Sequence, residues 1–139
     1  VRPFNARAET VVTKKLFKGS WRHKRCLLPA TGFFEKNYRI TRKDEKVFWL
    51  GGIWNRWSSA DGSELDSCCV LTTESNELVK PLHNRMPVII PNGLEDEWIA
   101  SVKDGPSLKA LETIMGQWNP LNWKAEMFDQ SPTSQMSLF

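Results

Sequence analysis

The spacing of apolar and polar residues changes along the chain, and each change predicts a different element. Residues 4–7 alternate as a short half-buried strand does. Residues 9–25 carry apolar side chains at a roughly helical spacing, and Gly19 should divide them into two short helices. From residue 26 the pattern favours strands, which we expect at residues 26–30, 33–35, 38–41, 47–50, 51–57, 67–72 and 86–90. Residues 42–46 should form a hairpin connection, and the strand 67–72 should be buried on both faces.

Helical spacing returns toward the C-terminus. We expect one or two helical turns at residues 75–80 and helices at 94–102 and 107–115, the last beginning just after Pro106. The chain has 139 residues and no internal repeat or low-complexity linker, which favours a single domain over residues 1–139. Many short strands with a few peripheral helices predict an α+β fold with a curved, barrel-like and mostly antiparallel sheet. Residues 127–139 show no pattern that assigns them a role.

The composition is that of a globular protein, with 40% apolar and 25% charged residues, seven tryptophans and seven phenylalanines. The three cysteines are Cys26, Cys68 and Cys69, without a C-x-x-C pair. This count argues against a disulfide framework or a zinc site and favours a reducing, cytoplasmic setting. Cys26 opens an apolar run, so we expect a small buried hydrophobe there. No stretch is apolar and long enough to span a membrane, and no signal peptide is visible.

Positive charge is concentrated near the N-terminus rather than spread evenly. The net charge of +3 and the pI near 8.8 say little by themselves about a polyanionic partner. The concentrated residues are Lys14, Lys15, Lys18, Arg22, Lys24 and Arg25, with His23 among them. A solvated helix face and a phosphate-facing patch explain this cluster equally well.

Four polar residues stand next to apolar strands or tight turns. Asn5 and Arg7 lie on one face of the first expected strand, Glu35 follows two phenylalanines, and His83 lies in a loop bounded by prolines. A carboxyl group in an apolar wall and a histidine nearby could together move protons. Each residue also has a structural explanation: Glu35 could pair with Arg7, His83 could bond a loop carbonyl, and Asn5 could cap a turn. Dinucleotide, Walker, zincin and G-x-S-x-G motifs are absent from the sequence.

Four segments, in this order along the chain, resemble motifs of the SOS-response-associated peptidase (SRAP) family. Residues 5–10 resemble its N-A-R-x-E-T motif, and residues 26–35 its C-L-x-P-x-x-G-F-Y-E-W segment. Residues 48–57 fit its F-A-G-L-W-x-x-W strand, and residues 71–76 with 83–89 resemble its T-T-x-A-N and H-x-R-M-P-V-I-L block. The resemblance covers residues 4 to about 100.

The resemblance implies an abasic-site function. Family members bind single-stranded DNA, especially near junctions with duplex, and capture abasic sites through an N-terminal cysteine. The α-amine, with a pKa of about 7.7–8.0, forms a Schiff base with the ring-opened sugar, and the thiol closes a thiazolidine crosslink. The chemistry implies no metal and no organic cofactor. "Peptidase" refers to removal of the family's own N-terminal residue.

The resemblance also assigns roles to residues. It implies that Asn5 and Arg7 hold the cysteine end and the DNA backbone, that Glu35 shuttles protons, and that His83 assists sugar ring opening. Arg85 is implied as a phosphate ligand, with Arg2 as a weaker candidate. We expect a monomer that acts in the cytoplasm on damaged DNA of the nucleoid.

Two departures from the family pattern change the expectation for this chain. The sequence starts at Val1 without the N-terminal cysteine, so we expect that the family's N-terminal segment is missing and that these residues alone do not crosslink. Lys36 stands where the motif usually has tryptophan. Two alternatives remain: a non-catalytic single-stranded-DNA-binding module, and a processing peptidase that acts on other substrates.

Overall fold

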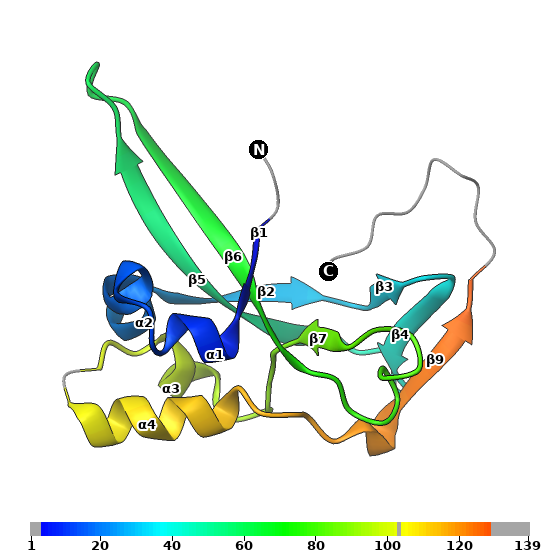
Figure 1. The fold of residues 1–139 in the computed structure, drawn as a ribbon. Helices are drawn as coiled ribbons and strands as arrows, with labels where there is room; N and C mark the ends of the chain where they lie inside the picture. Colours follow the sequence, from blue (N-terminus) through cyan, green and yellow to red (C-terminus); the bar gives the residue numbers. More distant parts are fainter. Residues whose placement is uncertain (1–3, 103, 129–139) are drawn as a thin grey trace.

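The fold is known from a computed structural model that describes residues 4–102 and 104–128 (Figure 1). The strands are β1 (Phe4–Arg7), β2 (Arg25–Ala30), β3 (Phe33–Glu35), β4 (Tyr38–Arg42), β5 (Phe48–Ser58), β6 (Glu64–Glu74), β7 (Arg85–Pro87), β8 (Ile89–Ile90) and β9 (Trp123–Met127). The helices are α1 (Ala8–Val11), α2 (Lys18–His23), α3 (Glu95–Ile99) and α4 (Gly105–Ile114), with short 3-10 helices η1 (Lys15–Phe17) and η2 (Pro120–Asn122). Short helices beside extensive sheet confirm the expected α+β class.

Two sheets organise the described residues. The six-stranded sheet has the order β1-β6-β5-β2, with β7 also paired to β6 and β8 to β5, and the three-stranded sheet has the order β3-β4-β9. β1 runs parallel to β6, and every other pair is antiparallel. The path from β1 to β2 is open, so these strands do not close into a barrel, which corrects that part of the expectation. In Figure 1 the four α-helices lie on one side of the molecule and the smaller sheet on the other.

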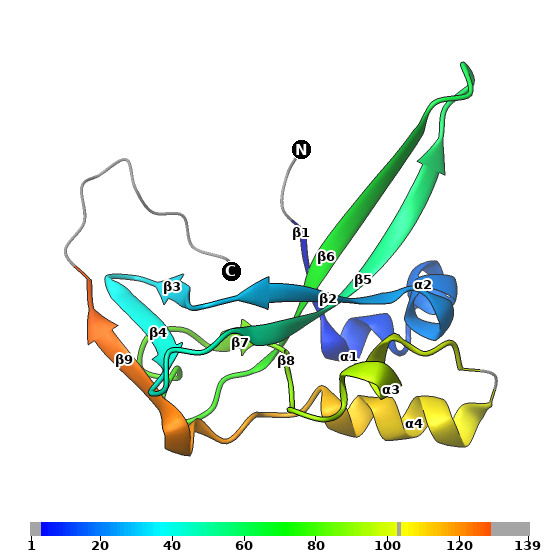
Figure 2. The ribbon, with the colours of Figure 1, turned by 180° about the vertical axis from the view of Figure 1, so that it is seen from behind.

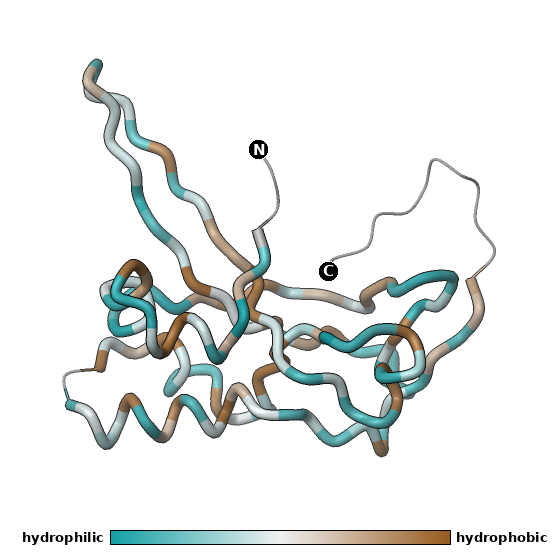
Figure 3. Tube along the Cα trace, viewed as in Figure 1, coloured by the Kyte–Doolittle hydropathy of each residue, from teal (hydrophilic) through white to brown (hydrophobic). Residues whose placement is uncertain are grey.

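β5 and β6 form a long hairpin whose outer half extends away from the helices and the smaller sheet (Figures 1 and 2). Hydrophilic and hydrophobic residues alternate along it, as expected for strands (Figure 3). Only Leu71, Thr72 and Thr73 of β6 are buried, whereas Leu65 is 58% exposed. The expectation that residues 67–72 are buried on both faces is therefore wrong for most of that strand, because its outer part extends past the packed elements.

The core has two clusters. The first packs the helices against the large sheet and includes Val11, Trp21, Leu71 and Trp98, with the two indole rings edge to face at 5.9 Å between centroids. The second fills the space between the two sheets, and its buried members are Phe33, Ile40, Phe48, Leu50, Val79, Met86, Ile89 and Trp118. Aromatic rings occur in both clusters, with Trp21 and Trp98 in the first and Phe33, Phe48 and Trp118 in the second.

The first helical region is divided earlier than expected. α2 runs through Gly19 without a break, whereas α1 ends at residue 11. The Thr13 hydroxyl donates to the carbonyls of Glu9 (3.1 Å) and Thr10 (3.3 Å), and Lys14 is extended. Such side-chain bonds compete with helical bonds, so the helix is interrupted at residues 12–14 and not at Gly19.

The segment 42–46 does not connect a hairpin. β4 pairs with β3 and β9, whereas β5 belongs to the large sheet, so the segment passes from one sheet to the other. The partner strand β9 was not expected from the sequence. A strand pattern shows which residues are extended but not which strand lies beside them.

The expected strand 86–90 is divided between two neighbours. β7 pairs with β6 and β8 with β5, and Val88 between them bonds both, its N–H donating to Leu71 O (2.8 Å) and its carbonyl accepting from Gly51 N (2.9 Å). The segment therefore crosses from one strand to the next at Val88.

The three other segments expected to be helical are found as turns, as a shorter helix and as a helix. Residues 77–80 form turns, because Asn76 Oδ1 accepts the N–H groups of Leu78 (3.1 Å) and Val79 (3.2 Å). The expected helix 94–102 stops at residue 99, since Ala100 is extended. The expected helix 107–115 is found as α4, which begins at Gly105, before Pro106, and ends at Ile114, and Asp104 caps it by accepting from Ser107 N (2.7 Å). Residues 131–139 lie outside the described residues, and among the described helices none is long and apolar enough to cross a membrane.

Candidate functional site

Asn5 and Arg7 lie on one exposed face at the edge of the large sheet. Ala6 between them packs against the first core cluster, so the two polar side chains point the opposite way. In register, Arg7 is opposite Thr72 of β6. Residues directly opposite one another in a sheet share a face, so Arg7 and Thr72 point to the same side.

Arg85 is tied to the same place from the other side of β6. Its Nη2 donates to the carboxylate of Glu9, at 2.9 Å to Oε2 and 3.2 Å to Oε1, and to the Thr72 carbonyl at 2.9 Å. Its Nε lies 3.4 Å from Thr72 Oγ1. The Arg85 side chain is 16% exposed and that of Glu9 58%. The guanidinium is therefore held between Glu9 of α1 and Thr72 of β6, the residue opposite Arg7 in the sheet.

His83 is held two residues before Arg85 by its own loop. Its Nδ1 accepts the backbone N–H of Arg85 at 2.9 Å, and Ser75 Oγ donates to the His83 carbonyl at 2.7 Å. The same nitrogen also lies 3.2 Å from the Arg85 carbonyl, so both polar groups of the Arg85 backbone contact the imidazole. The contact with a loop carbonyl foreseen for His83 is therefore present.

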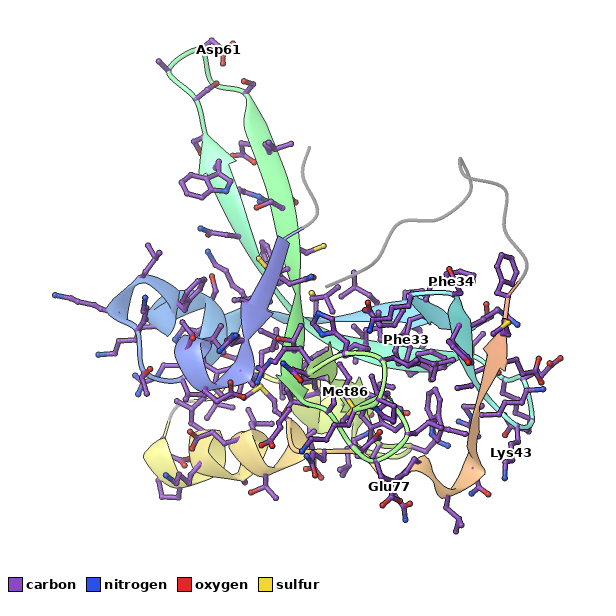
Figure 4. All side chains as sticks on the ribbon, turned by 45° about the vertical axis from the view of Figure 1, so that its right-hand side comes forward. Phe33, Phe34, Lys43, Asp61, Glu77 and Met86 are labelled. Carbon is purple, nitrogen blue, oxygen red and sulfur yellow. The ribbon has the colours of Figure 1, made fainter. Side chains whose placement is uncertain are left out.

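Glu35 lies in β3 of the smaller sheet. It is 4% exposed and shares a face of β3 with Phe33, which belongs to the second core cluster. Figure 4 shows Phe33 and Phe34 on opposite sides of β3. Met86, next to the arginine of the His83 loop, belongs to the same cluster. β3 and the segment 83–86 thus pack on a shared core, which places Glu35 on the side of β3 that faces this cluster.

Most of the basic cluster is on the surface, but one member is structural. Lys14, Lys15 and Lys18 are exposed, whereas Arg25 is 3% exposed. Its guanidinium donates to the carbonyls of Trp98 (2.6 Å), Ala100, Trp21 and Arg22 (3.0 Å). Burial lowers the pKa of the Arg25 guanidinium. Arg25 is therefore not available to a phosphate, and its position at the start of an apolar strand was the sequence signal for this.

The thiols differ in their surroundings. Cys26 is half-buried, and burial, with a smaller effect of Cys68 and Cys69, raises its pKa to about 11. Burial also raises the pKa of Cys69, whereas Cys68 is exposed. Since the thiolate is the reactive form, Cys26 is a poor nucleophile at neutral pH. Cys26 is thus less buried than expected, yet it remains chemically inert.

The sequence also raised the questions of Arg2, of Lys36 and of metal ligands. Arg2 lies outside the described residues. Lys36, at the position where the family motif usually has tryptophan, is exposed in the β3–β4 turn with φ 53°. Within residues 4–102 and 104–128, no three His, Cys, Asp or Glu side chains are grouped as metal ligands would be.

Glu9 and Thr72 are the site residues that the sequence reasoning missed. Both stand inside segments that resemble family motifs, which was the available signal. Their contact with Arg85 joins residues 76 and 13 positions apart in the chain. The pairing of β6 with β7 brings Thr72 to Arg85, and the parallel pairing of β1 with β6 brings α1 and Glu9 to the same place.

The chain is similar in sequence to several curated proteins. The chain is 37% identical over 111 residues to abasic site processing protein YoaM of Bacillus subtilis (strain 168), covering 73% of this chain and 49% of YoaM. It is 26% identical over 132 residues to abasic site processing protein YedK of Escherichia coli (strain K12), covering 85% of this chain and 59% of YedK. The chain thus spans about half the length of these curated relatives.

Solved structures and a family model also match this chain. The crystal structure of a protein from Bacteroides thetaiotaomicron superposes with a TM-score of 0.79 at 28% identity, covering 88% of this chain and 57% of that one. A protein from Bordetella bronchiseptica shares the fold, with a TM-score of 0.78 at 24% identity, covering 91% of this chain and 65% of that one. The model of the family described as "SOS response associated peptidase (SRAP)" matches residues 1–126. On this match and the relatedness to YoaM, the chain belongs to the SRAP family.

Proposed function

We propose that this chain forms the DNA-facing part of a protein that captures abasic sites in single-stranded DNA. The observation that supports this most directly is the set of contacts of Arg85, whose guanidinium bonds Thr72, the residue opposite Arg7, and whose backbone N–H bonds His83. Two cations next to a histidine suit a sugar–phosphate group that must be held while its ring opens. The names of the relatives, abasic site processing proteins, support the choice of lesion.

The proposed chemistry follows from the SRAP resemblance and uses an N-terminal cysteine. Its neutral α-amine adds to the aldehyde carbon of the ring-opened sugar, and loss of water gives an imine. The thiol then adds to the imine carbon, and its proton passes to nitrogen, which closes a thiazolidine without any oxidant or reductant. None of Cys26, Cys68 and Cys69 is at an N-terminus, and the raised pKa of Cys26 argues against it as a substitute.

The residues of this chain have distinct roles in the proposal. His83 assists ring opening as a proton donor to the departing ring oxygen, while Glu35 carries protons to and from the amine and thiol. Asn5 holds the cysteine end, and Arg7 and Arg85 bind the flanking phosphates, for which Arg2 is a further candidate. The protein would act as a monomer on damaged cytoplasmic DNA.

A second candidate is a single-stranded-DNA-binding module without catalysis. It is favoured by the half-buried, protonated Cys26 and by the exposed lysines of η1 and α2. Exposed cations and aromatic side chains suffice for sequence-tolerant binding of single strands.

One experiment separates the two candidates. The 139-residue chain, and a form extended at its N-terminus to a SRAP N-terminal cysteine, are each incubated with an oligonucleotide that carries one abasic site. A heat-stable shifted band on a denaturing gel from the extended form alone is the expected result. In that form His83→Ala and Glu35→Ala should slow capture by about 10²–10⁴-fold while DNA binding changes little. Bands from neither form would favour the binding module, and bands from both would mean that the nucleophile is another group.

A further inference from the structure

The Glu9–Arg85 ion pair joins the two segments that carry the candidate site. Glu9 is in α1, two residues after Arg7, and Arg85 begins β7, two residues after His83. The carboxylate accepts from Nη2 with both oxygens, at 2.9 and 3.2 Å. An ion pair whose carboxylate is more than half exposed generally contributes little to the free energy of unfolding. Stability therefore does not explain why Glu9 is placed beside Arg85.

The hydrogen bonds of Arg85 leave one part of its guanidinium for an external acceptor. An arginine side chain has five N–H donors. Nε and Nη2 are directed at Thr72 and Glu9, whereas Nη1 makes no hydrogen bond to any residue in the described part of the chain. An incoming phosphate oxygen would therefore meet Nη1, in an orientation that the contacts of Nη2 already fix.

The carboxylate also changes the charge that DNA would meet. Within 2.9 Å of Arg85, Glu9 offsets its positive charge, whereas Arg7 has no ion pair within the described residues. Phosphate binding releases counterions in proportion to the positive charge that binds. The two arginines of the site should therefore contribute unequally to affinity and to its salt dependence.

We propose that Glu9 is a positioning residue that fixes the guanidinium of Arg85 beside Arg7 and His83 while limiting the affinity of the site for phosphate. This inference rests on the proposed function insofar as the ligand is a single DNA strand. It adds that the site uses orientation in preference to full positive charge, so that undamaged strands are held less tightly.

The test compares Glu9→Gln with Glu9→Ala in the 139-residue chain. Both variants remove one negative charge, but only the glutamine oxygen can still accept from Nη2. Binding of a fluorescent single-stranded oligonucleotide with a tetrahydrofuran abasic analogue is measured against salt concentration. Both variants should steepen the slope of log K against log salt by up to about 0.7, and Glu9→Gln should bind several-fold more tightly than the parent. Glu9→Ala should bind less tightly than Glu9→Gln at every salt concentration.

Glu64→Gln is the matched control, since Glu64 is 57% exposed and pairs with Arg56 at 3.6 Å at the outer end of the hairpin. It should leave affinity and slope nearly unchanged. An unchanged slope for Glu9→Gln would overturn the charge role, and equal affinity of Glu9→Gln and Glu9→Ala would overturn the positioning role.

A second measurement does not depend on DNA. The NMR signal of the Arg85 Nε–H should report a rigid side chain in the parent and in Glu9→Gln, and a mobile one in Glu9→Ala. If the parent binds no oligonucleotide, the proposed function fails, while this signal still decides whether Glu9 positions Arg85. Equal mobility in all three proteins would overturn the inference even if DNA binds.

Discussion

The inner and outer halves of the β5–β6 hairpin use similar residues for different purposes. In the inner half, Leu71 is fully buried and Thr72 anchors Arg85, which joins β6 to α1. In the outer half, Leu65 is 58% exposed, and Arg56 binds Asp66 across the hairpin at 2.7 Å. The same two strands thus build a fixed site at one end and an exposed arm at the other (Figure 4, where Asp61 labels the tip).

The difference arises from what packs on each half. The helices and the smaller sheet cover the inner half, which excludes water and strengthens the hydrogen bonds of its buried polar groups. The outer half lies beyond both layers (Figure 2), where exposed pairs are screened by water and salt. The position of a residue along one strand therefore decides how much its interactions contribute to the free energy of folding.

The largest contrast should come from two leucines of the same strand. Leu71→Ala removes a side chain that is 0% exposed, and should destabilise the fold by about 2–5 kcal/mol through lost burial and a cavity. Leu65→Ala, at a position that is 58% exposed, should cost no more than about 0.5 kcal/mol. Urea unfolding followed by tryptophan fluorescence measures both values. Equal losses would show that the outer arm is packed in solution, contrary to the comparison.

The second-largest contrast should be in the reactivity of the cysteine thiols. With a pKa of about 11, Cys26 carries little thiolate at pH 8, and iodoacetamide should alkylate it about 100-fold more slowly than an unperturbed thiol. Because burial raises the pKa, its rate should climb as the pH approaches 11. The exposed Cys68 should react first. Mass spectrometry of digests follows each site, with Cys68→Ser as the control, and rapid labelling of Cys26 at pH 8 would contradict the burial of its thiol.

The smallest contrast concerns two exposed arginines and DNA. Arg7→Ala should weaken binding of single-stranded DNA about tenfold and reduce the salt slope by about 0.7, because one phosphate contact is lost. Arg56→Ala should change affinity less than twofold, since Arg56 is already bound to Asp66. Arg85→Ala should weaken binding but reduce the slope less than Arg7→Ala. Fluorescence anisotropy over a salt series measures all three, and similar effects of Arg7→Ala and Arg56→Ala would place the DNA elsewhere.

Several elements followed from local pattern alone. The alternation in residues 4–7 gave β1, and Pro106 marked the start of α4, because these signals depend on neighbouring residues. Their positions beside apolar strands or tight turns made Asn5, Arg7, Glu35 and His83 site candidates, and the family motifs then assigned them roles. The break at Thr13 and the turns after Asn76 were missed, although both come from short-range side-chain bonds.

The sequence by itself determined the α+β class, the main strands and the residues that can carry charge or protons. Only the tertiary structure decided that Arg25 is bound to buried carbonyls, that β4 belongs to a second sheet and that Glu9 holds Arg85. The physical reason is that periodicity reports which side of an element is apolar, whereas partners are chosen by strand order and register. The parallel pairing of β1 with β6 joins segments more than sixty residues apart, and no local pattern specifies it.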